Sequence, residues 1–282
     1  MANKAVIVGA AIGLAIVAVL ALREWQPTAP PPETAQAPAP VAALPAAAPA
    51  SAPASAPTGP LHPIEAAVAA AASGPAPATA PANVEDALVA LLGRKEVLSA
   101  LQIDDFPRRF AATVDNLGRA TASPRLWPVN PTPGRFATVT RGNVTTISAD
   151  NAQRYTPFVL LVESVDMRRA VATYVQLYPL IQQAYEDLGF PGRYFNDRLV
   201  EVIDLLLATP EIEAPLAVVL PTISGPVLPD RPWVLYAFDA PELKSLSAGQ
   251  KILLRMGPVN ERRLKAKLTE IRGLVTKAQP SR

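Results

Sequence analysis

The chain has 282 residues, a formal net charge of +2 and no cysteine. Disulfides, thiolate catalysis and cysteine-based zinc or iron sites are therefore excluded. The single histidine, His62, lies in a proline-rich stretch, so the remaining sequence offers no imidazole for a Ser-His-Asp triad, a histidine metal cluster or a proton shuttle. We expect no cofactor and no metal, and this composition does not favour an enzyme.

A membrane anchor is predicted near the N-terminus. Residues 5–22 read AVIVGAAIGLAIVAVLAL and contain no charge. As a helix they span roughly 27 Å at about 1.5 Å per residue, close to the hydrocarbon thickness of a bilayer. A cleaved secretory signal has a shorter apolar core of about 7–15 residues and a prompt small-x-small cleavage site. Here the first good triplet, residues 35–37, comes too late. We favour an uncleaved single-pass anchor over residues 1–25.

The distribution of positive charge predicts the orientation of this anchor. Lys4 precedes the span, and the first Lys or Arg after Arg23 is Arg94. Because Lys and Arg resist translocation, we expect a cytoplasmic N-terminus. The rest of the chain should then lie in the periplasm, anchored to a bacterial inner membrane. This location removes nucleic acid from the list of expected partners.

Ala5, Gly9 and Gly13 recur every four residues and share one face of the predicted span. Small residues at this spacing let two helix backbones approach closely. They mark a candidate face for a homodimer, although Gly and Ala are also simply common in membrane helices.

Residues 26–82 form a proline- and alanine-rich linker, with 15 of the 32 prolines between Pro27 and Pro81. Glu33 and Glu65 are its only charged residues. Proline removes backbone donors, and such a composition buries too little apolar surface to fold. We predict a disordered, extended spacer. At about 3.1 Å per residue its full reach is on the order of 170 Å.

A folded domain is expected over residues 83–278, with an α+β fold that is mostly α-helical and has a small minor antiparallel sheet. Caps and stop signals predict helices over 84–92, 95–101, about 104–117, 157–163, 167–188, 197–208, 247–256 and 259–277. Asn196 is the expected N-cap of the sixth helix, and Pro179 the expected kink of the fifth. Alternating polarity predicts a β-hairpin over 136–148 and strands over 216–220 and 234–238.

Four segments carry a resemblance to a known family. They read FAATVDNLGR from Phe110, LYPLIQQAYEDLGFPGRYFNDRLVEVIDLLLATPE from Leu177, YAFDAPELKSLSAGQKILLRMGP from Tyr236 and KAKLTEIR from Lys265. The chain resembles the proteobacterial domain of unknown function 3014 family over roughly residues 85–272. The resemblance implies a membrane-anchored envelope protein of Gram-negative bacteria. It implies no reaction and supplies no catalytic residues.

Asp197, Glu201 and Asp204 lie at positions i, i+4 and i+7, so a helix places three carboxylates on one face. They are candidates for binding a cation or a basic partner, or for acid–base work on a sugar. The helix is otherwise apolar, however, and we favour the reading that the stripe is its solvated edge.

Residues 251–282 carry a net charge of +7, and the last helix is amphipathic. Arg262, Arg263 and Lys265 are candidates for contact with anionic lipid or cell-wall polymer. Residues 184–213 carry a net charge of −5, and we favour a pairing of these two segments inside the fold.

Two further patterns have structural explanations. Tyr174, Tyr178, Ile181 and Tyr185 share one helical face, which is typical of core packing. The segment Ser247-Ala248-Gly249-Gln250 opens a helix, and an N-cap explains it better than an anion site.

These features predict a single-pass inner-membrane protein whose non-enzymatic periplasmic domain binds or positions a cell-envelope partner. Two alternatives remain. One is a carboxylate-dependent enzyme acting on cell-wall polysaccharide, and the other is a regulator that clamps a membrane enzyme through dimerisation of the anchor.

Overall fold

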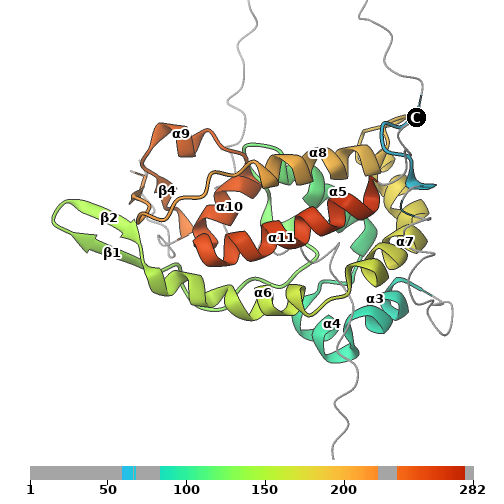
Figure 1. Ribbon diagram of the computed structural model, residues 1–282, viewed down its shortest axis with the longest axis horizontal. Helices are drawn as coiled ribbons and strands as arrows, with labels where there is room; N and C mark the ends of the chain where they lie inside the picture. Colours follow the sequence, from blue (N-terminus) through green and yellow to red (C-terminus); the bar gives the residue numbers. More distant parts are fainter. Residues whose placement is uncertain (1–58, 66, 68–82, 222–233, 277–282) are drawn as a thin grey trace, which may run out of the picture.

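The computed structural model describes residues 59–65, 67, 83–221 and 234–276 (Figure 1). The predicted anchor, with Ala5, Gly9 and Gly13, and most of the predicted linker lie outside these ranges. Within them, no helix combines the length and the apolar character needed to cross a membrane.

The described chain is mostly helical. Its α-helices are α3 (Val84–Leu92), α4 (Arg94–Ala100), α5 (Phe106–Leu117), α6 (Thr156–Glu163), α7 (Met167–Asp187), α8 (Phe195–Leu207), α9 (Pro241–Lys244), α10 (Ala248–Met256) and α11 (Pro258–Val275). Two short 3₁₀ helices are η1 (Pro124–Leu126) and η2 (Ala149–Arg154). The predicted mostly helical α+β class is confirmed.

Strands form two small antiparallel sheets of two strands each. β1 (Thr138–Arg141) pairs with β2 (Val144–Ile147), and β3 (Val218–Val219) pairs with β4 (Ala237–Phe238). A bridge between Thr146 and Ala217 joins the two pairs, and the Ile147 amide donates to the Leu216 carbonyl at 2.9 Å. The β1–β2 hairpin projects from one end of the helical body (Figure 1).

Helices α5, α7, α8 and α11 enclose the main core. Helix α11 runs beside α8 (Figure 1). Phe195 from α8 lies at its centre, with ring centroids 5.6 Å from Phe110 and 5.5 Å from Tyr185. Tyr174 and Ile181 are buried on the same face of α7. The aromatic stripe therefore packs in the core, as its spacing predicts.

Several helix starts follow their expected caps. The side chain of Asn83 accepts from the Asp86 amide, and Asp166 accepts from two amides of α7. Ser247 and Gln250 form a reciprocal capping box at α10, because the hydroxyl and the side-chain amide each satisfy an otherwise unpaired backbone amide.

Asn196 differs from its expected role. α8 begins at Phe195 with Tyr194 as the cap, and Asn196 is fully buried in the first turn. Its side chain accepts from the Tyr174 hydroxyl at 3.0 Å and donates to the His62 carbonyl at 2.8 Å. These long-range partners, which local sequence does not reveal, take the side chain away from the helix end.

Candidate functional site

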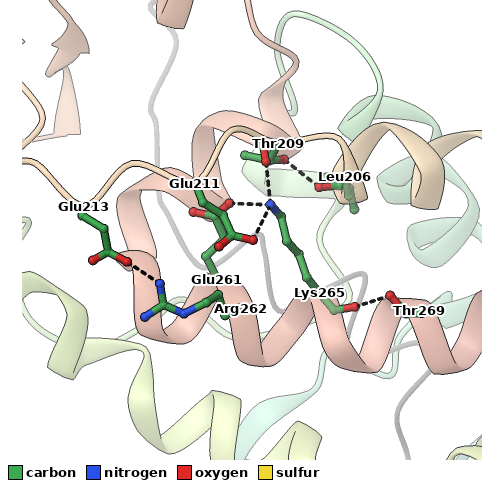
Figure 2. A network of polar contacts seen from close by, with 8 residues as sticks. All are labelled: Leu206, Thr209, Glu211, Glu213, Glu261, Arg262, Lys265 and Thr269. Atoms are coloured by element: carbon green, nitrogen blue, oxygen red, sulfur yellow. Dashed lines mark hydrogen bonds and ion pairs between the residues drawn. The ribbon is translucent and has the colours of Figure 1, made fainter.

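Most of the candidate charged residues meet where α11 packs along α8 and the segment that follows it. Asp204 ends the carboxylate stripe of α8, and Glu211 and Glu213 follow within the same acidic stretch. On α11, Glu261, Arg262, Lys265 and Arg272 face these carboxylates. We call these seven residues the α8–α11 charge network (Figure 2 shows five of them).

Lys265 lies at the centre of this network (Figure 2). Its ammonium group lies 3.0 Å from Glu261 and 3.3 Å from Glu211, and it also donates to the Thr209 carbonyl. The Lys265 side chain is only 12% exposed and that of Glu261 only 1%. A nearly dry lysine is therefore satisfied by two carboxylates and one carbonyl, which is what a buried cation requires.

Burial also affects the protonation of Glu261. Removal from water disfavours its charged form and raises the pKa of Glu261 above its usual value of 4.5, although Lys265 opposes the shift. A carboxyl group with a raised pKa is one mark of a catalytic acid. Carboxyl groups in buried structural ion pairs show the same shift. The geometry around Glu261 therefore has to decide between a catalytic acid and a structural ion pair.

The other cations of α11 are also paired. Arg262 pairs with Glu213, Arg263 lies 3.3 Å from Glu163 of α6, and the Nη2 of Arg272 donates to Asp204 at 3.0 Å. Glu213 and Asp204 raise the pKa of Arg262 and Arg272 respectively. The basic helix and the acidic stretch thus neutralise each other within the fold, which is the arrangement that their net charges favour.

The three carboxylates of the α8 stripe have separate partners. Glu201, whose side chain is 63% exposed, pairs with Arg198 at 2.8 Å, whereas Asp204 pairs with Arg272. Asp197 accepts backbone amides of the predicted linker. They share a face but do not converge on a common point. Across the described ranges, His, Cys, Asp and Glu side chains form no group of three that suits a metal ion.

Asp115 of α5 is a buried carboxylate that the sequence reasoning missed. Arg119 reaches one of its oxygens, and Arg198 donates to the other at 2.9 Å. Burial lowers the pKa of Arg198, but Glu201 and Asp115 outweigh it and leave that pKa raised. The four-residue spacing of Asp115 and Arg119 was the available signal. This cluster ties α5 to α8.

A small pocket lies elsewhere in the described structure, beside α10. It is lined by Ala120, Thr121, Ala122, Trp127, Ala248, Lys251, Ile252 and Arg255. None of the candidate residues of α8 or of the network lines it. The candidate carboxylates therefore do not border this pocket.

This geometry defines a mostly helical α+β domain in which charge pairs link α11 to α8 and to the segment that follows α8. The chain belongs to the family described as "Protein of unknown function (DUF3014)", whose model matches residues 106–272. The match takes in both sheets, α5–α8, α10 and most of α11, and hence the whole charge network. Comparison with curated proteins and with solved structures gives no match.

Proposed function

We propose that the chain is a single-pass inner-membrane protein that presents a non-enzymatic domain in the periplasm, where the domain binds or positions a cell-envelope partner. The apolar run over residues 5–22 supports the anchor. The absence of Lys and Arg between Arg23 and Arg94 supports export of everything beyond it.

One observation carries the non-enzymatic part of the proposal: each charged side chain that the sequence marks as a candidate has a partner within the described part of the chain. Asp197, Glu201 and Asp204 are held by different groups, and Arg262, Arg263 and Lys265 each contact a glutamate. A hydrolase of the glycosidase type needs two carboxylates facing one substrate bond. The candidate stripe does not supply that arrangement, so we assign no catalytic role to its charges.

The exposed surface suits contact with another macromolecule. Val139 and Val144 of the projecting hairpin are 40% and 54% exposed, and Val219 of the adjoining β3 is 38% exposed. Val139 and Val144 share one face of the hairpin in its register, and exposed apolar side chains that lie together are typical of a contact surface. We therefore place the partner contact at this hairpin.

Photo-crosslinking in living cells tests this proposal. A photoreactive residue at Val144, in the full chain, should yield a discrete crosslinked product containing an envelope protein or wall fragment. The matched control is Leu160 on α6, which is similarly exposed at 50% and should not yield that product. Equal labelling from both positions, or none from Val144, would contradict the assignment of the hairpin as the contact surface.

A further inference from the structure

Residues of the predicted spacer are bound to the folded domain. The Leu61 amide donates to Asp197 Oδ2 at 3.0 Å, and the His62 amide donates to Asp197 Oδ1 at 2.7 Å. Asn196 donates from its Nδ2 to the His62 carbonyl at 2.8 Å. Two adjacent side chains at the start of α8 thus hold two successive residues, because they offer both an acceptor pair and a donor.

Contacts from two other helices hold the Asn196 side chain in place. Asn196 is fully buried, and the Tyr174 hydroxyl donates to its Oδ1 at 3.0 Å. Its Nδ2 also donates to the Val275 carbonyl of α11 at 3.4 Å. Since α7 and α11 both hold the amide group in place, little side-chain entropy is lost when a peptide binds.

Apolar contacts continue along the segment. Ile64 packs against the main core and Ala67 is fully buried in it, whereas Leu61 is 68% exposed. The domain therefore contacts the backbone at residues 61 and 62. At residues 64 and 67 it contacts apolar side chains that are branched or small. The chain bends at residues 61 and 62 and is helical at Ile64, Glu65 and Ala67, so such recognition suits a peptide that turns from a bend into a short helix.

We propose that Asn196 and Asp197 form a peptide-binding site whose ligand is residues 61–65 and 67 of the same chain. The fifteen residues between Ala67 and Asn83 keep the ligand at a high effective concentration, since closing a short loop costs little entropy. The segment therefore outcompetes the same segment of a second copy.

Given the proposed anchor, this docking sets how far the domain reaches. With residues 59–67 held on the domain, the free spacer has 33 residues in place of 57. At about 3.1 Å per residue its full reach falls from on the order of 170 Å to about 100 Å. Docking at this site therefore shortens the distance that the domain can reach from the membrane.

Amide exchange in the full chain tests the site directly. The Leu61 and His62 amides should exchange at least ~10-fold more slowly than other spacer amides. Both Asp197→Ala and His62→Pro should abolish the protection of Leu61. His62→Pro removes one donor and leaves the domain untouched, so it separates loss of docking from loss of folding. Glu201→Ala, on the same helix, is the control and should leave the protection intact. Unprotected amides in the parent chain would overturn the proposal.

Spin labels test the docking geometry, because the cysteine-free chain accepts labels at chosen positions. Leu61→Cys and Leu180→Cys are both exposed sites, at 68% and 52%, and should give a narrow distance distribution that His62→Pro broadens. A broad distribution in the parent, or a narrow one that appears only between singly labelled chains, would overturn docking within one chain. Neither readout depends on the membrane, so a failure here is distinct from a failure of the proposed topology.

Discussion

The ammonium group of Lys265 lies 3.0 Å from the carboxylate of Glu261, one turn earlier on α11, and both side chains are largely out of water. Removing Lys265 strands the carboxylate of Glu261, since a lone buried ion has no solvent to stabilise it. Lys265 without Glu261 would keep Glu211 and the Thr209 carbonyl. This pair is therefore the most sensitive point of the charge network.

Lys265→Met should lower the free energy of unfolding by about 3 kcal/mol, because it leaves Glu261 buried without its cation. Denaturant unfolding measures the change. Lys267→Met is the matched control on the same helix, as Lys267 pairs with the half-exposed Glu270 at 3.3 Å, and should cost at most about 1 kcal/mol. Adding Glu261→Gln to Lys265→Met should restore part of the loss. Equal losses for the two lysine variants would contradict the buried-pair account.

The raised pKa of Glu261 predicts a pH dependence of stability. Between 4.5, its usual value, and the higher value in the fold, the folded state binds more protons than the unfolded state. The stability contributed by the protonated carboxyl is thus present at low pH and is lost as pH rises through the folded pKa. Relative to Glu261→Gln, the parent chain should lose stability as pH increases from 4.5 upward. Paired urea titrations measure this difference, and a constant or opposite trend would contradict a raised pKa.

Gly249 marks a close approach between α10 and its neighbours. A Cβ added there would lie 2.5 Å from Leu206 Cδ2 and 3.2 Å from the Leu117 carbonyl oxygen. Gly249→Ala should therefore destabilise the domain by about 1–3 kcal/mol, although alanine favours helices. Gly273→Ala on α11 meets nothing within 4 Å and should stabilise by about 0.5–1 kcal/mol. Thermal unfolding of both variants measures the two changes in stability. Melting temperatures that shift in the same direction would contradict the prediction.

The alternative enzyme hypothesis has its own test. Glu201 is exposed and pairs with Arg198, so Glu201→Gln should change the unfolding free energy by at most about 0.5 kcal/mol. We expect the purified full chain to release no products from cell-wall polysaccharide, with or without this substitution. Product release that Glu201→Gln abolishes at unchanged stability would support the enzyme instead.

Local patterns predicted most of the helices because their signals are local. Asn83, Asp166 and Ser247 cap the helices that they precede, and each cap depends only on residues within one turn. The pairing of basic α11 with the acidic stretch was likewise visible in the net charges of the two segments. The mostly helical class followed from these features.

What the sequence did not reveal depends on contacts between distant segments. Asn196 is the residue type of an N-cap, but Tyr174, His62 and Val275 engage its side chain in the core. Ala67 lies in a stretch that reads as spacer, yet it is fully buried. Neither outcome has a local signature, because both arise from surfaces that form only when the chain folds.

The central claim is the export of the folded domain behind an uncleaved anchor. Reporter fusions after Arg282 test it most directly, using a phosphatase that is active only outside the cytoplasm and, in a parallel fusion, a reporter that is active only inside. We expect the phosphatase fusion alone to be active, in membrane fractions and at the full length of the chain. An inactive phosphatase with an active cytoplasmic reporter would contradict the account.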